Sequence, residues 1–326
     1  MANNQENKNQ RKPRYRRAPT DRVRLQGRDI EIIKLVHKHR FLSSAHLAAL
    51  LPGSSQGLLR RLNLLFHNAY LNRPPEQIRP YRQGSDPMIY GLGNKGADLL
   101  ANDFGVPRTK VDWTSKNREV KKYYLEHTLL VSDFMVCLEV ACRKIGNIKI
   151  IGPGEIFAAM PSQPKQPANP WSWKVQVKRE SPGGTRQLSF SIIPDKIFGL
   201  HFTADPAGRN KAYFFLEADR STMPIKRASL FKSSYYKKML GYWASWKEEL
   251  YQRHFGFKNA RILTLAKSQD RIKSMIEACK EVDERGQGSK MFLFAQARDF
   301  NLTQPERVLA KAWRNGRDDD LMSLTD

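Results

Sequence analysis

Residues 213–224 read YFFLEADRSTMP, and this order of residue types predicts how a buried strand ends. Four large apolar or aromatic residues run directly into Glu217, Ala218 and Asp219. A short apolar run of this kind is typical of a strand inside a sheet. Because residues i and i+2 of a strand point to the same face, we expect the carboxylates of Glu217 and Asp219 to lie together where this strand ends.

A third carboxylate precedes this stretch. The segment QLSFSIIPDKIFGLHF (187–202) carries Asp195 after an apolar run, so pairing of the two segments would place Asp195 beside Glu217 and Asp219. Converging carboxylates repel one another, and a hard cation such as Mg²⁺ removes that cost. The alternative is that the acids of 217 and 219 form ion pairs with nearby Arg220 or Lys226.

The elements around the acids predict an α/β fold. A long helix over about 118–145, two hairpin strands, the two acid-bearing strands, a helix over about 225–252 and the short apolar strand ARILTLAKS follow in that order. Strands followed by a helix and a buried strand indicate a mixed sheet. We expect this domain to cover 118–300, with 301–326 as a polar tail.

The preceding part, 27–105, predicts a winged helix-turn-helix domain. Two amphipathic helices are followed by the break PGSS (52–55), a third helix and a basic stretch between two short strands. The third helix would enter the major groove of DNA, although a protein-binding three-helix domain is the alternative. The candidate DNA-contacting residues are Gln56, Arg60, Arg61 and Asn63 on the third helix, and Arg73, Arg79 and Arg82 on the wing.

Charge supports a polyanionic partner. The 326 residues contain 56 Lys plus Arg and 32 Asp plus Glu, a formal net charge of +24. Such an excess favours nucleic acid, because cations that neutralise phosphates release counterions. A solubility-driven surface or an anionic membrane are the alternatives. We expect residues 1–26 to be a disordered basic arm and 106–117 to be a linker.

Other composition signals concern the compartment. The sequence has no apolar run long enough to span a membrane, and its polar, basic beginning lacks the apolar core of a signal peptide. Three cysteines, an odd number, show no paired spacing and are expected to be reduced thiols. We therefore expect a cytoplasmic protein with no membrane partner.

The motif PD followed by E-x-D on consecutive strands resembles the PD-(D/E)xK nuclease superfamily. The chain resembles more closely the replication-relaxation family of mobile-element proteins, which includes the MobC-type mobilisation relaxases, through the motifs HTLLVSDF, PD, FFLEADRSTMP and KMLGY. The resemblance implies a winged helix-turn-helix followed by a restriction-endonuclease-like α/β core with a mixed sheet. It also implies catalytic roles for Asp195, Glu217, Asp219, Lys238 and Tyr242, with the three acids binding Mg²⁺ or Mn²⁺.

The resemblance further implies a metal-dependent DNA nickase or relaxase. It would act on double-stranded DNA at an origin of transfer or replication, with other mobilisation proteins as further candidate partners. The lysine that the nuclease superfamily places two residues after its acid is Asp219 here, so Lys238 or a second metal would replace it. The nucleophile could be water or one of Tyr235, Tyr236 and Tyr242. The alternative is a non-catalytic DNA-binding regulator or mobilisation accessory protein with a degenerate nuclease fold.

Overall fold

A computed structural model describes residues 13–78, 86–107, 121–161, 169–181, 184–283 and 285–326 of the chain. The chain divides into two compact units, Met1–Ser132 and Asp133–Asp326, and the boundary falls within one long helix, α7 (Lys122–Ile145). Among the described helices, none has both the length and the apolar character needed to cross a bilayer.

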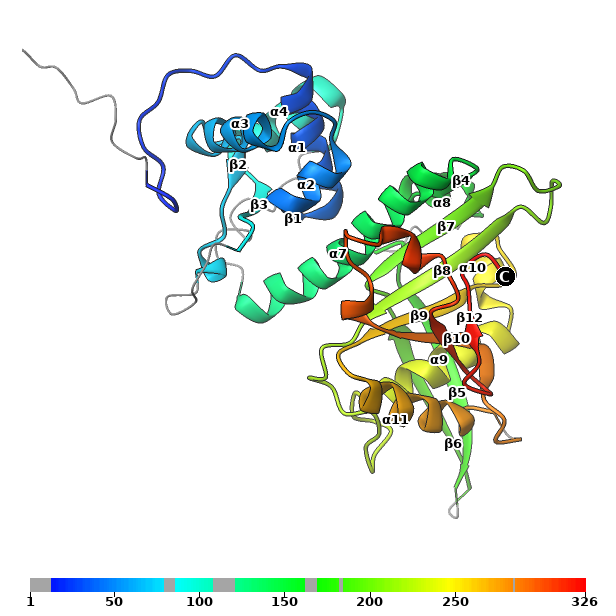
Figure 1. The fold of residues 1–326 in the computed structure, drawn as a ribbon. Helices are drawn as coiled ribbons and strands as arrows, with labels where there is room; N and C mark the ends of the chain where they lie inside the picture. The colour runs from blue at the N-terminus through cyan, green and yellow to red at the C-terminus, as the bar shows by residue number, and fades with distance from the viewer. Residues whose placement is uncertain (1–12, 79–85, 108–120, 162–168, 182–183, 284) are drawn as a thin grey trace, which may run out of the picture. The chain divides into compact units, whose positions relative to one another are not determined.

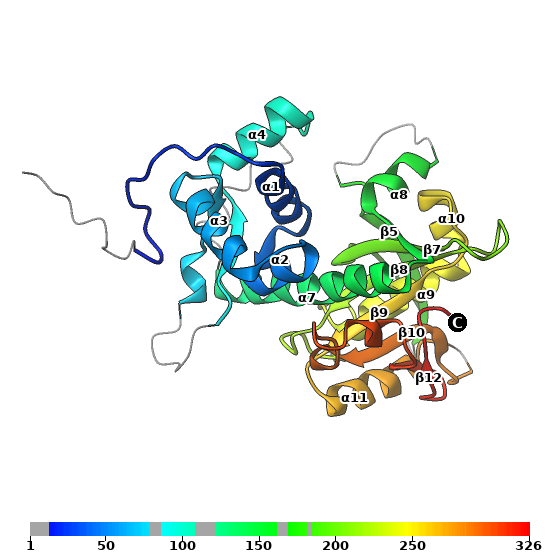
Figure 2. The same cartoon turned by 45° about the horizontal axis from the view of Figure 1, so that its top comes forward.

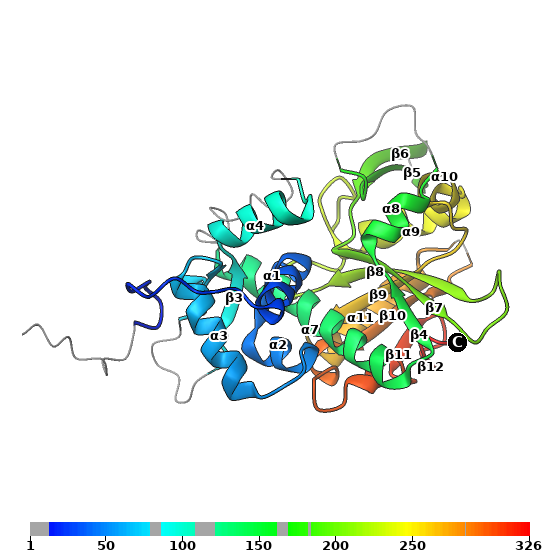
Figure 3. The same ribbon diagram turned by 90° about the horizontal axis from the view of Figure 1, so that it is seen from above.

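The first unit has the predicted winged helix-turn-helix architecture (Figure 3). Ser43 and Ser54 cap α2 and α3 by accepting the backbone N–H of His46 and Gly57, so the helices begin after each serine. The hairpin of β2 and β3 forms the wing, and β3 also pairs with β1. The elements are α1 (Gly27–His39), β1 (Phe41–Ser43), α2 (Ser44–Leu50), α3 (Ser55–His67), β2 (Leu71–Asn72), a 3-10 turn η1 (Pro75–Gln77), β3 (Ile89–Leu92) and α4 (Asn94–Phe104).

The prediction of a disordered arm over residues 1–26 is wrong for residues 13–26, which contact the folded unit. Residues 1–12 lie outside the described residues. Arg17 donates to the carbonyls of Phe66 and Leu71 at 3.0 and 3.2 Å, and the backbone N–H of Ala18 donates to His67 Nδ1 at 3.1 Å. The last carbonyls of a helix lack partners within it, so a cation at this position is favourable. The predicted linker lies almost wholly outside the described residues.

The second unit is the predicted α/β domain with a mixed sheet (Figure 1). The seven strands lie in the order β12-β11-β10-β9-β8-β7-β4; β8, β9 and β10 run parallel and the other pairs are antiparallel. The strands are β4 (Ile148–Ile151), β7 (Lys196–Phe202), β8 (Lys211–Ala218), β9 (Arg261–Ala266), β10 (Ser289–Gln296), β11 (Trp313–Gly316) and β12 (Leu321–Met322). The helices are α8 (Pro153–Ala159), α9 (Tyr235–Lys247), α10 (Leu250–Phe255) and α11 (Gln269–Lys280), with short turns η2 (Ala297–Asp299) and η3 (Pro305–Val308).

Helices cover both faces of this sheet, as expected for parallel strands. Phe215 of β8 belongs to the apolar cluster that includes buried residues of α9, α10 and α11, and Figure 2 shows these helices with β8 and β9. The neighbouring residue Phe214 points to the opposite face, where Phe198 stacks on it at 5.1 Å and contacts Phe134 of α7. The sheet is therefore an inner layer between α7 and the α9–α11 helices.

A separate hairpin, β5 (Trp173–Ser181) and β6 (Gly184–Ile192), packs on α9. Gly241 of α9 makes this contact close, because a Cβ at that position would lie 2.5 Å from Ile192 Cδ1. Trp173 reaches beneath the helix, where its indole N–H donates to Ser245 Oγ at 2.8 Å and its ring lies 5.3 Å from that of Phe215. The hairpin thereby holds α9 against the sheet.

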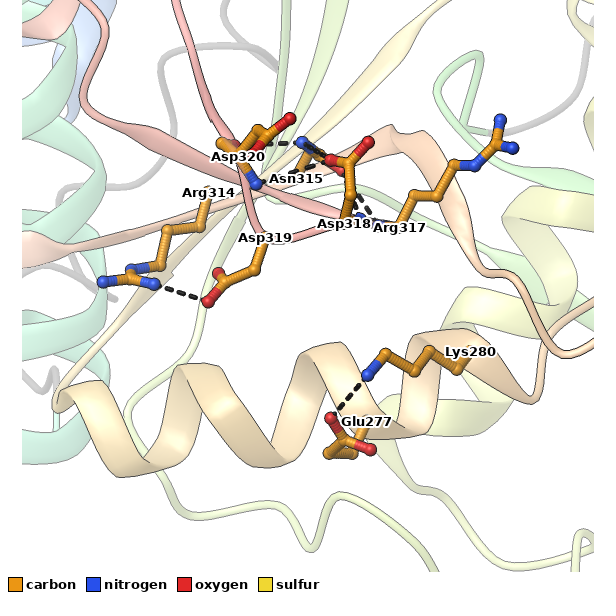
Figure 4. A network of polar contacts seen from close by, with 8 residues as sticks. All are labelled: Glu277, Lys280, Arg314, Asn315, Arg317, Asp318, Asp319 and Asp320. Carbon is orange, nitrogen blue, oxygen red and sulfur yellow. Dashed lines mark hydrogen bonds and ion pairs between the residues drawn. The ribbon is translucent and has the colours of Figure 1, made fainter.

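The expectation of a polar tail over 301–326 is wrong. This segment adds β11 and β12 to the sheet, and Trp313 and Leu324 are fully buried. The acids between these strands form the turn in Figure 4: Asn315 accepts the backbone N–H groups of Arg317 and Asp318, and Arg314 donates to Asp319 at 2.6 Å. A hydrogen bond from Lys290, which has the larger effect, and another from Asn315 lower the pKa of Asp318 to about 2.

Replacing Trp313 with alanine should lower the free energy of unfolding of the second unit by about 3–5 kcal/mol, because it empties a buried site. The ring packs edge-on against Phe134 at 5.8 Å and lies 5.0 Å from Phe300. Urea unfolding followed by circular dichroism measures the loss. Leu321→Ala is the matched control, since Leu321 is 53% exposed in the same segment; equal stability of the two variants would contradict this assignment.

Candidate functional site

The three predicted carboxylates gather at one edge of the sheet. In the antiparallel pairing of β7 and β8, Lys196 lies opposite Leu216, which places Asp195 opposite Glu217. The backbone N–H of Asp195 donates to the Leu216 carbonyl at 3.0 Å, and the Ala218 N–H donates to Asp195 Oδ2 at 2.8 Å. Glu217 and Asp219 share a face because they are two residues apart in an extended segment.

Glu217 is the most deeply buried of the three, with 3% of its surface exposed. The hydroxyl of Tyr242 donates to its Oε1 at 2.6 Å, and the ammonium of Lys238 donates to its Oε2 at 2.5 Å. Lys238 and Tyr242 are four residues apart on α9 and therefore face the same side of that helix. Each carboxylate oxygen of Glu217 thus has a donor on α9.

Burial dominates the electrostatics of this group. It raises the pKa of Glu217 to about 7, with Lys238 opposing the rise and Asp195 adding to it. Burial alone would lower the pKa of Lys238, but the charge of Glu217, followed by that of Asp195, outweighs it and raises that pKa. Burial, followed by the charge of Glu217, raises the pKa of Tyr242 well above its ordinary value, so its hydroxyl remains a donor.

Asp219 has a partner that the sequence did not indicate. Arg271, in the first turn of α11, donates from Nε and Nη2 at 2.8 and 3.0 Å, a bidentate pair. The nearby cation Lys226 instead pairs with Glu281, which lies outside the site. The expected pairing with Lys226 is therefore wrong, and Arg271 and Lys238 are the cations bonded to Asp219 and Glu217. Ser268, which caps α11, was the available sequence signal for where that helix starts.

The structure brings together all five residues proposed for catalysis. The charges of Asp195, Glu217 and Asp219 all act on Lys238, which reaches them from α9. Among the described residues, however, no group of three or more His, Cys, Asp or Glu side chains has a geometry that could hold a metal ion. Each carboxylate accepts hydrogen bonds from donors of the chain itself, and Arg271 occupies both oxygens of Asp219.

The three candidate tyrosine nucleophiles are buried in the fold. The hydroxyl of Tyr235 is hydrogen-bonded to Thr264 Oγ1, that of Tyr236 donates to the Glu281 carbonyl at 3.0 Å, and that of Tyr242 donates to Glu217. The hydroxyl of each of these tyrosines is thus engaged with a neighbouring group of the protein.

The residues proposed to contact DNA differ in their environment. Gln56 and Arg60 are exposed on α3, whereas Arg61 binds the buried Asp29 of α1 with two nitrogens. Asn63 is partly buried and accepts a hydrogen bond from Arg73 at 3.0 Å.

Arg73 also has structural contacts, because its guanidinium lies 4.2 Å from the centre of the Phe66 ring and donates to Tyr90. The remaining wing residues, Arg79 and Arg82, lie outside the described residues. Gln56 and Arg60 are thus the described candidates whose side chains are exposed.

Comparison with known proteins identifies the family. A family model described as replication-relaxation matches residues 33–259, more than half of the chain. The chain belongs to the replication-relaxation family. Membership confirms the resemblance seen in the sequence motifs and indicates a role in DNA replication or mobilisation. No curated protein and no solved structure matches the chain.

The matched region contains all five residues proposed for catalysis. It includes Asp195, Glu217, Asp219, Lys238 and Tyr242, but it ends before Arg271. The partner of Asp219 therefore comes from a part of this replication-relaxation protein that the family match does not reach.

Replacing Lys238 with methionine, in EDTA, should lower the free energy of unfolding by about 3 kcal/mol near pH 8, where Glu217 would be ionised without its cation. Because the pKa of Glu217 is already raised to about 7, the acid can protonate at lower pH. The loss should therefore shrink near pH 5.5 and grow as pH rises, as linkage requires. The double variant Lys238→Met, Glu217→Gln should lose this pH dependence; an equal loss at both pH values in the single variant would contradict it.

Adjacent arginines on α3 should have separable effects. Arg61→Ala should lower the free energy of unfolding of the first unit by about 3 kcal/mol, because it leaves Asp29 buried and unpaired. Arg60→Ala should leave stability unchanged and weaken binding to duplex DNA by about tenfold. Thermal unfolding measures the stability of each variant, and fluorescence anisotropy measures its affinity for duplex DNA. A stable Arg61→Ala variant with weakened DNA binding, beside an unstable Arg60→Ala variant, would contradict both predictions.

Proposed function

We propose that this protein binds double-stranded DNA in replication or mobilisation and cleaves one strand with the help of Mg²⁺ or Mn²⁺. The observation that carries the proposal is the cluster of Asp195, Glu217 and Lys238 at one sheet edge. Phosphodiester cleavage requires groups that hold a hard cation and a positive charge near the phosphate. Two carboxylates and a lysine are suited to these two tasks.

The first unit supports the DNA-binding part of the proposal. It is a winged helix-turn-helix in which Gln56 and Arg60 are exposed on α3, the helix that such domains place in the major groove. The net charge of +24 favours a phosphate-rich partner. Duplex recognition by the first unit and strand cleavage by the second would thus be separate functions of one chain.

Whether a metal ion can bind here depends on which carboxylate oxygens can exchange their present hydrogen-bond donors for the ion. Mg²⁺ takes one or two carboxylates together with water and phosphate oxygens, a donor set that Asp195 and Glu217 can supply. At Glu217 the ion would replace the ammonium of Lys238, so a divalent cation would substitute for a monovalent one. Asp219 fits less well because Arg271 holds both of its oxygens. When bound, the ion would polarise the phosphate and lower the pKa of the attacking water.

The side chains of the protein then have distinct tasks. Tyr242 orients Glu217 through its 2.6 Å hydrogen bond and stays protonated. Lys238, once displaced from Glu217, is the cation available to stabilise negative charge on the phosphate, as the lysine missing at position 219 would do. Arg271 links Asp219 to the Met223 carbonyl and thereby holds the segment that follows β8.

A second candidate function is that of a non-catalytic DNA-binding regulator or mobilisation accessory protein. The observation in its favour is that each carboxylate already accepts hydrogen bonds from the chain: Asp195 from Ala218, Glu217 from α9, and Asp219 from Arg271. A cluster compensated in this way is stable without a metal ion. Both functions require tight, salt-dependent DNA binding, so only cleavage separates them.

The test is nicking of supercoiled plasmid that carries the origin region of the element encoding the protein. Wild type with Mg²⁺ or Mn²⁺ should produce open circles, and EDTA should prevent this. Asp195→Ala and Glu217→Gln should each reduce nicking by at least about 100-fold while keeping duplex affinity. Glu277→Gln is the control, because Glu277 is an exposed acid of α11 that pairs with Lys280.

The outcome also decides between the two functions. Binding by all variants without nicking by wild type would overturn the cleavage proposal in favour of the regulator or accessory protein. Nicking that survives both acid substitutions would show that cleavage occurs elsewhere or comes from a contaminant. Loss of nicking in the Glu277→Gln control would mean that the assay reports on folding instead of the site.

A further inference from the structure

A second feature of the α/β unit lies at the opposite end of β8 from the carboxylates. A groove of about 940 Å³ opens beside Lys211, Arg261 and Ser289, the residues at which β8, β9 and β10 begin. Helix α9 connects the two places, with Lys238 near its start at the carboxylates and Trp246 near its end in the groove. Eight residues of helix separate those two side chains by about 12 Å along the axis.

The groove is strongly basic. Six cationic side chains line it against two acidic ones, Asp283 and Asp326, which gives an excess of four positive charges. Some of the cations have protein partners: Lys290 pairs with Asp318 at 2.8 Å, and Arg261 donates to the Ser323 carbonyl at 3.3 Å. The cationic residues are Lys211, Lys247, Arg261, Arg285, Lys290 and Arg317.

Aromatic rings lie among these cations. Trp243 and Trp246 have ring centres 5.0 Å apart, and 42% of the surface of Trp246 is exposed. The indole N–H of Trp246 donates to Asn259 Oδ1 at 3.2 Å, which fixes the orientation of the ring. Tyr213 adds a third ring to the lining and stacks on Phe257 at 4.1 Å. An oriented, exposed tryptophan gives a flat surface on which an unpaired base can stack.

We propose that this groove binds a segment of single-stranded DNA. Sites for single-stranded nucleic acid combine a cationic path for the phosphates with aromatic rings that stack on bases, and both features occur here. A duplex has its base faces covered and could use only the cations. The chemistry is thus that of an unpaired strand, which replication and mobilisation both generate. This inference does not depend on strand cleavage by the carboxylates.

The test compares binding of a short oligothymidylate and of a duplex to the full chain in EDTA, by fluorescence anisotropy. Trp246→Ala should weaken binding of the single strand by about tenfold, because it removes a stacking surface, and should leave duplex affinity unchanged. Phe157→Ala is the matched control, because Phe157 is also 42% exposed but lies on α8, outside the groove.

The cations supply a second, independent variant. Arg285→Ala should reduce single-strand affinity and make the dependence of log K on log salt shallower by about 0.7, the value for one phosphate contact on a single strand. Arg285 is exposed, so this variant should fold normally. Lys149→Ala is its control, because Lys149 is an exposed cation of β4, at the other edge of the sheet.

Three results would overturn the proposal. The first is equal single-strand affinity of the groove variants and their controls. The second is an equal loss of duplex and single-strand binding in Trp246→Ala, which would indicate a surface without preference for unpaired bases. The third is a stronger dependence of oligouridylate than of oligothymidylate binding on Trp246, which would assign the groove to RNA. Because these measurements need no divalent cation, they can fail while plasmid nicking succeeds, and the reverse.

Discussion

The buried carboxylate of Glu217 is the constraint on which the second unit depends. A carboxylate removed from water needs compensation by charge or hydrogen bonds, and α9 supplies both through Lys238 and Tyr242. This requirement sets the position of α9 along β8. Gly241, in the same helix, then allows the β5–β6 hairpin to pack closely against its outer side. The hydrogen bonds to Glu217 and the packing of the β5–β6 hairpin thus both fix the position of α9.

The same constraint shapes what the site can do. Lys238 holds the oxygen of Glu217 that the proposed divalent cation would need, so that ion would have to displace the present ion pair. Asp219 would be less available to it, because two nitrogens of Arg271 hold both of its carboxylate oxygens. The cluster, with its cations already in place, is therefore compatible with both proposed functions, strand cleavage and non-catalytic DNA binding.

The helix-turn-helix unit shows how differently two adjacent residues of one type can act. Arg60 is exposed on α3, whereas Arg61 compensates the fully buried Asp29 of α1. Arg73 on the wing is likewise held by an aromatic ring and by Asn63. Part of the large positive charge thus stabilises the fold, whereas Arg60 and most cations of the groove at the start of β8 are exposed.

The sequence by itself determined both domain types, the start of the third helix after the break at 52–55, and the shared face of Glu217 and Asp219, because helix breaks and strand alternation are local properties. Only the tertiary structure decided the partner of Asp219, since Arg271 is 52 residues away and alternation does not reveal which helix covers a face. The tertiary structure also decided that 301–326 contributes the strands β11 and β12 to the sheet. The sequence did not predict these strands, because they are short, charged turn residues lie between them, and β11 pairs with the distant strand β10.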